Sequence, residues 1–284
     1  MHGPDHGSGN AGPRPAPEPL PVPAPGSLTG TSVVVTRARA QASGLVHRLT
    51  DLGAAVVELP VIAIEGPADG GAALAAASDR LVDGRYEWVV LTSSNAVGRL
   101  VDAIGSRPVP AATRWAAVGT STAKALMTRG IVPDLVPAAA VSDALVEAFP
   151  TATPPGAAPG RGTREGTALF VRAERVRAVV VPGLSAKGWR VDETVAYRTV
   201  AGAVDPSAVE AARAADVVAF TSSSTVERTV ELLGVDGMPP VVASIGPVTS
   251  ATARAVGLVV TVEAVEHTLD GLVAAVAVAV GGRR

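Results

Sequence analysis

The sequence has no cysteine among its 284 residues. Disulfide bonds, thiolate nucleophiles, cysteine-ligated zinc and iron–sulfur clusters are therefore excluded, and the fold does not need an oxidising compartment. Aromatic residues are also scarce, at 3% of the chain, which argues against stacking platforms for bases or sugars. Among the 4 histidines, no pair has the spacing of metal ligands. We therefore expect no metal site.

Neither sign of charge dominates. Lys and Arg number 24 against 26 Asp and Glu, a formal net charge of -2 at pH 7. A duplex-binding protein usually shows a basic footprint, so we expect no nucleic-acid partner. The most apolar run, residues 272–280, is far shorter than the ~20 residues of a membrane span. Because residues 1–30 also lack the apolar segment of a secretory signal, we expect a cytoplasmic protein without membrane contact.

Apolar residues make up 48% of the chain, and the mean hydropathy is +0.34. This is enough apolar material for a buried core, so global disorder is excluded. Proline and glycine concentrate in two segments. We predict a disordered or polyproline-like tail at residues 1–30 and a linker or long surface loop at residues 150–166.

Short β-branched runs alternate with Ala- and Leu-rich segments of helical period. The expected strands are residues 32–36, 55–59, 88–91, 115–118, 167–171, 191–195, 217–220 and 241–245. The expected helices are residues 41–52, 74–82, 96–104, 122–128 and 175–185. Strands that are apolar throughout and alternate with helices are typical of a parallel sheet covered on both faces. The sequence therefore predicts the α/β class.

The chain also contains an internal repeat. Residues 92–97 (TSSNAV) match residues 221–226 (TSSSTV), Gly119 matches Gly246, and Arg37 matches Arg172. The offsets of these pairs lie between 127 and 135 residues. Two copies of one doubly wound α/β unit are the simplest account.

Hydroxyl-bearing clusters follow a strand directly in each copy. Ser93, Ser94 and Asn95 form the first cluster, and Ser222, Ser223 and Ser224 form the second. Their hydroxyls and backbone N–H groups at a helix start suit an anion. The alternative is that these residues only cap helices, because Ser, Thr and Asn are the preferred N-caps.

A second pair of signals is Gly119 with Thr122 and Gly246 with Thr249. A glycine lets the backbone approach a ligand closely, and the amides that follow can face outward. Neither segment contains a Walker A loop or a G-x-G-x-x-G fingerprint, so nucleotide binding has little support.

Three further side chains are candidates. Arg37 and Arg172 each follow the first strand of their copy, where a guanidinium can hold a carboxylate by two hydrogen bonds or can simply cap a loop. Tyr197 follows a strand of the second copy, and its hydroxyl can donate a proton to a leaving oxygen. The alternative for Tyr197 is packing with its hydroxyl paired.

Taken together, these segments resemble the uroporphyrinogen-III synthase family. The segments that carry the resemblance are VTR at 35–37, LGA at 52–54, LP at 59–60, LTSSNAV at 91–97, VGTSTA at 118–123, YRT at 197–199, FTSSS at 220–224 and IGPVT at 245–249. The resemblance implies an enzyme that converts the linear tetrapyrrole hydroxymethylbilane, which bears many carboxylates, into uroporphyrinogen III. The conversion removes water, closes the ring and inverts ring D, and it uses no cofactor.

The resemblance also implies an architecture. Two flavodoxin-like, doubly wound parallel-sheet domains are expected, joined by a two-stranded ladder, with the substrate in the cleft. Domain one would comprise residues 31–62 plus 199–284, and domain two residues 63–198, after a tail at 1–30. We expect a monomer.

By the same resemblance, Tyr197 matches the tyrosine thought to assist loss of the hydroxyl group, and Thr122 and Thr249 match the cleft threonines. Ser93, Ser94, Ser222 and Ser224 match the hydroxyl-bearing loops. The chain departs from the family pattern at three positions: relatives often carry Pro where Ser94 and Ser223 stand, and Thr where Val248 stands.

Two other functions compete with this reading. A non-catalytic two-domain binding protein for a small anionic ligand would suit the same clusters, but its mark would be a secretory signal. A nucleotide-dependent transferase would need a phosphate loop or an acidic set for Mg²⁺, and neither is evident.

Overall fold

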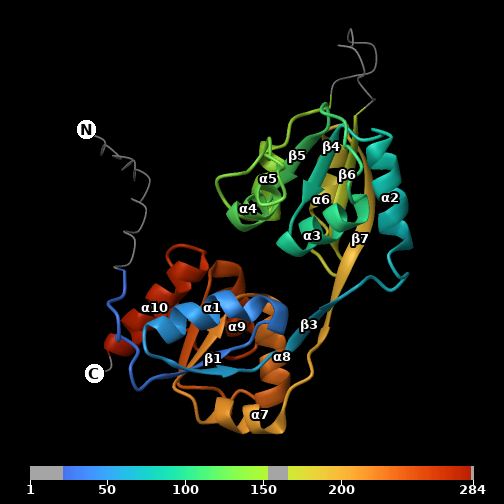
Figure 1. The fold of residues 1–284 in the computed structure, drawn as a ribbon. Coiled ribbons are helices and arrows are strands. Elements are labelled where there is room, and N and C mark those ends of the chain that lie inside the picture. Colours follow the sequence, from blue (N-terminus) through green and yellow to red (C-terminus); the bar gives the residue numbers. More distant parts are fainter. Residues whose placement is uncertain (1–21, 153–165, 283–284) are drawn as a thin grey trace, which may run out of the picture. The chain divides into compact units, whose positions relative to one another are not determined.

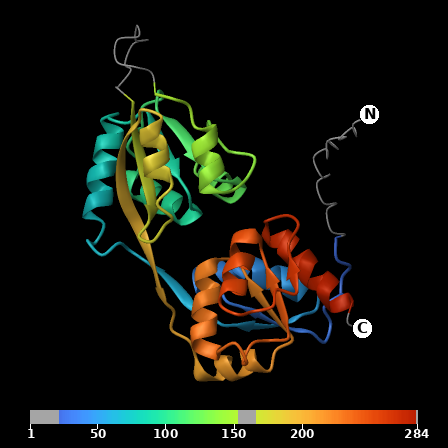
Figure 2. The same ribbon diagram turned by 180° about the vertical axis from the view of Figure 1, so that it is seen from behind.

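The computed structural model describes residues 22–152 and 166–282. The chain divides into two compact units, which Figures 1 and 2 show as ribbons. Unit 1 combines Met1–Val61 with Val204–Arg284, and unit 2 is the continuous segment Ile62–Ala203. Unit 1 is therefore assembled from both ends of the chain.

The sheet of unit 1 has the order β10-β9-β8-β1-β2, and every pairing in it is parallel. Its strands are β1 (Ser32–Val35), β2 (Ala55–Glu58), β8 (Val217–Phe220), β9 (Val241–Ser244) and β10 (Val262–Glu263). Every residue of β8 and β9 is buried, as expected of central strands in a sheet that is covered on both faces.

Helices cover both faces of this sheet (Figure 2). They are α1 (Arg39–Asp51), α7 (Pro206–Arg213), α8 (Ser223–Leu233), α9 (Pro247–Ala255) and α10 (Leu269–Gly281). Helix α1 packs beside α10, where Leu45 and Leu49 join Leu272 and Val276 in one core cluster. Helix α8 packs beside α9. Within the described ranges, no helix combines the length and apolar character needed to cross a membrane.

The sheet of unit 2 has the order β3-β7-β6-β4-β5. Its strands are β3 (Ile62–Glu65), β4 (Trp88–Leu91), β5 (Arg114–Ala117), β6 (Thr167–Ala173) and β7 (Arg190–Ala201). The pairings among β4, β5, β6 and the first part of β7 are parallel. The last part of β7 pairs antiparallel with β3, from Glu65 opposite Arg198 to Ile62 opposite Ala201.

Two helical layers flank this second sheet. The helices are α2 (Ala72–Val82), α3 (Ser94–Ile104), α4 (Thr120–Met127), α5 (Ser142–Ala148) and α6 (Val180–Ala186). Residues of α2, α3 and α4, including Leu74, Leu100 and Leu126, form a core cluster on one face. Leu145 of α5 and Leu184 of α6 belong to the cluster on the other face.

The two sheets repeat the same strand order. In unit 1, β9, β8, β1 and β2 lie side by side in this order. The first three of these strands lead to Gly246, Thr221 and Arg37. In unit 2 the run β5-β4-β6-β7 places the equivalent strands, which lead to Gly119, Thr92 and Arg172, in the same order. This agreement matches the internal repeat of the sequence.

Two expectations from the sequence need correction. The predicted tail is too long, because Leu28 is fully buried in the core of unit 1 and its N–H donates to the Leu52 carbonyl oxygen at 2.9 Å. The helix expected at residues 175–185 begins only at Val180. Residues 1–21 of the expected tail and 153–165 of the expected linker lie outside the described residues.

Candidate active site

The residues singled out by the sequence gather at the carboxyl edge of each sheet. We call Arg37, Ser222, Ser223, Ser224 and Gly246 the unit 1 rim; they follow β1, β8 and β9. We call Ser93, Ser94, Asn95, Gly119, Arg172 and Tyr197 the unit 2 rim; they follow or lie near the ends of β4, β5, β6 and the parallel part of β7. Parallel strands present their carboxyl ends at one edge, which is where open α/β sheets bind ligands.

Tyr197, Ser93 and Asn95 form one hydrogen-bonded group in unit 2. The Tyr197 hydroxyl donates to Ser93 Oγ at 2.9 Å, across 104 residues of sequence. Ser93 Oγ also accepts from the backbone N–H of Asn95 at 3.1 Å. Tyr197 is only 7% exposed, while Ser93 is half-buried. Tyr197 is thus packed with its hydroxyl paired, as the alternative interpretation expected, and this hydroxyl lies at the unit 2 rim.

A β-bulge in β7 explains why Tyr197 faces Ser93. Along the β6–β7 pairing, Arg172 lies opposite Val195 but Ala173 lies opposite Tyr197, so Ala196 is an extra residue. Consecutive residues of a regular strand point to opposite faces, yet Ala196 and Tyr197 both belong to the core cluster beneath α3. The bulge therefore turns Tyr197 toward the start of α3, as bulges beside active sites often do.

In both hydroxyl clusters the first serine caps a helix, as the alternative interpretation expected. Ser93 is the N-cap of α3, and Ser222 is the N-cap of α8, where its Oγ accepts from the Thr225 N–H at 3.4 Å. The remaining cluster members differ in what they contact. Ser94 is exposed, Ser224 lies 3.1 Å from Ser222 through their hydroxyl oxygens, and the Ser223 Oγ lies 2.6 Å from the Thr252 Oγ1 of α9. Ser223 therefore ties α8 to α9.

The two glycines at the rims are explained by close neighbours. Gly119 begins α4 and Gly246 begins α9, both with extended backbone. A Cβ on Gly119 would lie 2.5 Å from the Ala140 Cβ, and one on Gly246 would lie 2.9 Å from the His267 Cδ2. The contact with Ala140 requires glycine at position 119 whether or not a ligand approaches, because the Ala140 Cα also lies close. At position 246 the exposed side chain of His267 could turn aside.

Thr122 and Thr249 occupy equivalent positions, three residues after the rim glycines. They are 1% and 5% exposed, so both side chains pack almost entirely inside their units. The backbone amides at the starts of α4 and α9 are therefore the more accessible polar groups at these two positions.

The two arginines of the repeat have different surroundings. Arg172 donates from Nε to Glu193 Oε2 at 2.9 Å and from Nη1 to the carbonyl oxygens of Ala173 and Glu174 at 2.9 and 2.7 Å. Its side chain is 19% exposed. The loop-capping alternative therefore describes Arg172, whose guanidinium is already held on two sides.

Arg37 is half-buried and has no hydrogen bond or ion pair with any other residue that the structure describes. Burial lowers the pKa of its guanidinium below the ordinary value, because desolvation disfavours the charged form. A cation that is partly removed from water without a counterion favours binding of an anion. Arg37 is thus the cation of the unit 1 rim that remains open to a ligand.

His267 contacts the unit 1 rim, although the sequence did not single it out for the site. It is exposed, and its ring lies against Gly246 at the start of α9. The next residue, Thr268, caps α10 by accepting from the Gly271 N–H at 3.0 Å, as its position before the helix predicts. The sequence carried no signal for the contact with Gly246, because α9, β10 and the loops beside β10 separate the two positions.

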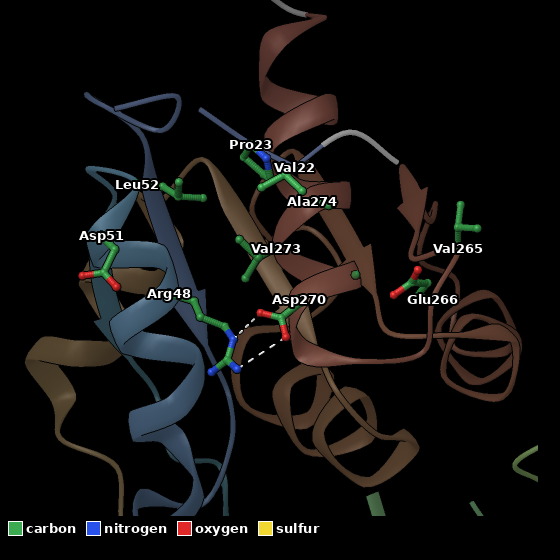
Figure 3. A pocket seen from close by; sticks show the side chains of 11 residues that line it. Val22, Pro23, Arg48, Asp51, Leu52, Val265, Glu266, Asp270, Val273 and Ala274 are labelled. Carbon is green, nitrogen blue, oxygen red and sulfur yellow. Dashed lines mark hydrogen bonds and ion pairs between the residues drawn. The ribbon is translucent and has the colours of Figure 1, made fainter. Parts of the chain in front are cut away.

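Unit 1 also contains a pocket of about 640 Å³ between the end of α1 and the start of α10 (Figure 3). Its walls are mostly apolar, and the Arg48–Asp270 ion pair, with Nε to Oδ1 at 2.6 Å, crosses one side. The lining residues are Val22, Pro23, Arg48, Asp51, Leu52, Val265, Glu266, Asp270, Gly271, Val273 and Ala274. None of them belongs to the unit 1 rim, so this pocket is separate from the candidate site.

Comparison with known proteins gives consistent matches along most of the chain. A family model described as "Uroporphyrinogen-III synthase HemD" matches residues 43–274. A curated uroporphyrinogen-III synthase of Synechococcus elongatus is 35% identical over 260 residues, which cover 86% of this chain and 93% of that protein. The porphyrin biosynthesis protein HemD of Ruminiclostridium josui is 33% identical over 108 residues, which cover 37% of this chain and 21% of that protein.

Solved structures show the same fold. A mutant uroporphyrinogen III synthase of Thermus thermophilus matches with a TM-score of 0.59 at 19% identity, covering 89% of this chain and all of that one. The uroporphyrinogen-III synthetase of Helicobacter pylori matches with a TM-score of 0.53 at 14% identity, covering 85% of this chain and 95% of that one. These likenesses establish an α/β fold with parallel sheets.

Proposed function

The chain belongs to the uroporphyrinogen-III synthase family, and from this premise we propose how its own residues serve the reaction. It is a lyase of tetrapyrrole biosynthesis that cyclises hydroxymethylbilane to uroporphyrinogen III, with loss of water and inversion of ring D. The match to the family model across residues 43–274 carries this conclusion.

The chemistry makes two demands on the protein. Loss of the hydroxyl group from the hydroxymethyl carbon needs a proton for the leaving oxygen. Closure with inversion needs the flexible, many-carboxylate chain to be held in one shape, because the free chain also closes without inversion. In our proposal the unit 2 rim supplies the first function, and the carboxylate-binding groups of both rims supply the second, without a cofactor.

Arg37 is the leading carboxylate ligand in this proposal. Its guanidinium is half-buried, lacks a partner among the described residues and stands at the carboxyl end of β1. A guanidinium can hold both oxygens of a carboxylate. Arg172, which is held by Glu193 and two carbonyl groups, instead serves as framework for the loop after β6.

Helix starts are the second source of carboxylate binding. The backbone N–H groups at the beginnings of α3, α4, α8 and α9 lie at the positive ends of the helix dipoles. In this role Gly119 and Gly246 contribute backbone, as do the buried Thr122 and Thr249. Ser94, Asn95, Ser222 and Ser224 add polar groups beside them, and Ser223 holds α8 against α9.

Tyr197 is the proposed catalytic residue. Its hydroxyl is held at the start of α3 by the 2.9 Å hydrogen bond to Ser93 and is aimed there by the bulge at Ala196. A phenol in this position can help a hydroxyl group to leave as water.

Several finer features complete the proposal. The two units act as the two flavodoxin-like domains, with boundaries near residues 62 and 199, and the antiparallel β3–β7 pairing serves as the ladder between them. The enzyme works as a monomer in the cytoplasm.

The deciding experiment supplies freshly made hydroxymethylbilane to the purified chain and separates the I and III isomers after oxidation. Production of isomer III well above the spontaneous background is expected. If only isomer I appears, at the spontaneous rate, the alternative of a non-catalytic anion-binding protein replaces the enzyme.

A further inference from the structure

Tyr197 itself is poorly placed to touch a substrate. Only 7% of the residue is exposed, and its ring is part of the core cluster beneath α3. Its hydroxyl proton is already engaged, because the hydroxyl donates to Ser93 Oγ at 2.9 Å. A proton that leaves this phenol therefore goes first to Ser93.

Ser93 has the opposite character. Its Oγ accepts two hydrogen bonds, from the Tyr197 hydroxyl at 2.9 Å and from the Asn95 N–H at 3.1 Å. A serine hydroxyl has two acceptor positions and one proton, so both acceptor positions are filled and the proton remains to be donated. The structure gives that proton no acceptor among the described residues, and Ser93 is half-buried at the rim.

The surroundings of Ser93 also strengthen it as a donor. Hydrogen bonds that a hydroxyl accepts polarise its own O–H bond. One of the two comes from a backbone N–H at the start of α3, the positive end of an eleven-residue helix. The other comes from a phenol, which is a stronger acid than an alkyl alcohol.

We propose that Ser93 is the group that contacts the leaving hydroxyl, and that Tyr197 and Ser93 together form a two-proton relay. This inference rests on the proposed function. As the C–O bond of the hydroxymethyl group breaks, its electron pair leaves with the oxygen, which takes the Ser93 proton and departs as water. The pyrrole nitrogen lone pair fills the electron-poor carbon, Ser93 takes the Tyr197 proton, and the phenolate later regains a proton from solvent.

The internal repeat supports a special role for the tyrosine. Ser222 holds the equivalent cap position in unit 1, and its Oγ lies near the Ser224 and Thr225 hydroxyls rather than a phenol. Capping alone therefore needs no tyrosine at this place in the fold. The bulge that turns Tyr197 toward Ser93 is an additional feature of unit 2, and the relay gives it a function.

The first test compares Ser93→Ala with Ser93→Thr. Ser93→Ala removes the terminal donor, and we expect kcat for isomer III to fall at least 100-fold, in the range of general acid catalysis. Ser93→Thr keeps the hydroxyl and is expected to stay within tenfold of wild type. Thr268→Ala is the matched control, because it removes a cap hydroxyl from α10 and should lower Tm similarly with kcat unchanged.

The second test counts protons. Single-turnover rates are measured in mixtures of H₂O and D₂O and plotted against the deuterium fraction of the solvent. For wild type the plot should be curved, because two protons move in one step. For Tyr197→Phe, where one proton moves, the plot should be a straight line. The double variant Ser93→Ala/Tyr197→Phe should be no slower than Ser93→Ala alone, because both changes break one relay.

Three results overturn the relay while leaving the enzyme assignment intact: an unchanged kcat in Ser93→Ala, a straight line for wild type, or fully additive losses in the double variant. Failure of the wild-type chain to make isomer III overturns the enzyme assignment instead, so the two failures are distinguishable.

Discussion

At the scale of single residues, the two arginines of the repeat show how similar sequence surroundings lead to different roles. Glu193 in β7 lies opposite Phe170, and Glu58 in β2 lies opposite Val35 at the equivalent position. Arg172 is bonded to Glu193, but no ion pair joins Arg37 to Glu58 in the described structure. The sequence pattern is the same around both arginines, so it cannot predict which of them forms an ion pair. That depends on the direction in which each side chain points.

Replacing Arg37 should therefore affect KM, whereas replacing Arg172 should affect the free energy of unfolding. Arg37→Ala is expected to raise KM about tenfold, from loss of one charge-assisted carboxylate contact, while the free energy of unfolding changes by less than about 1 kcal/mol. Arg172→Ala should lower the free energy of unfolding by about 1–3 kcal/mol with KM unchanged, because it breaks bonds to Glu193 and to two carbonyl groups. Steady-state kinetics and urea unfolding measure both quantities. A raised KM in Arg172→Ala alone would reverse the assignment.

Tyr197→Phe tests the proposed role of Tyr197 as the proton source behind Ser93. The change removes one hydroxyl from a buried ring, so we expect kcat to fall about 100-fold and the free energy of unfolding to fall by only about 1 kcal/mol. Isomer-resolved kinetics and thermal unfolding of the same preparation give the two numbers. Unchanged turnover would remove Tyr197 from the mechanism.

The sequence predicted Tyr197 and Ser93 separately but not their hydrogen bond. The resemblance pointed to both residues, and the preference of serine for N-caps pointed to Ser93 again. Their contact spans 104 residues and depends on one extra residue in β7. Local sequence patterns carry no information about such a long-range pairing.

At the scale of elements, most of the described strands were predicted within a few residues, because strands buried on both faces leave clear apolar runs. The expected helices correspond to α1, α2, α3, α4 and α6, and no helix range was predicted for α5, α7, α8, α9 or α10. The expected helix at 175–185 was wrong at its start, since residues 174–179 form a bend and turn before α6. The fully buried Leu28 was also missed, because the prolines that precede it indicated an unpacked tail.

The Asp216 side chain is hydrogen-bonded to Ser32 and so joins the amino ends of β1 and β8. This contact predicts that the free energy of unfolding depends on pH. Asp216, just before β8, accepts from the Ser32 N–H at 2.8 Å and from the Ser32 Oγ at 2.6 Å. These hydrogen bonds from the Ser32 hydroxyl and then its N–H lower the pKa of the Asp216 carboxyl. A lowered folded-state pKa stabilises the fold above the unfolded value of about 3.9, and that stabilisation is lost as pH falls through the folded value.

Asp216→Asn should therefore be less stable than wild type at pH 7, and the difference should shrink below about pH 4. Urea unfolding at pH 7, 5, 4 and 3 measures the difference directly. Thr261→Ala is a control in the same unit, because the Thr261 Oγ1 accepts from the Val242 N–H at 3.1 Å rather than donating to a carboxylate. Its free-energy difference from wild type should therefore not change with pH in the same way. A constant difference between wild type and Asp216→Asn at every pH would contradict the argument.

At the scale of the whole molecule, the two units differ in continuity. Unit 2 is one segment with its own sheet and a core cluster on each face. In unit 1, β1 lies between β2 and β8, and β8 follows only after all of unit 2. The internal repeat predicted two copies of one unit, but only the resemblance pointed to the interruption of the first by the second.

Excised fragments test this difference. Ile62–Ala203 produced alone should unfold in one cooperative transition, because every strand of its sheet is present. Residues 22–61 alone should show no such transition, since β1 would lack β8 and the core residues of α10. Circular dichroism during heating distinguishes the outcomes, and a broad, non-cooperative melt of the first fragment would contradict the prediction.

The pairing of β1 with β8 also has a consequence for synthesis on the ribosome. Strands β1 and β2 are synthesised well before β8, the other partner of β1, because the 158 residues 59–216 lie between the end of β2 and the start of β8. Until then the apolar Val33, Val34 and Val35 have no β8 beside them. Strand β1 is thus made long before one of its two neighbours in the sheet, and during that interval we expect its apolar side chains to be bound by chaperones.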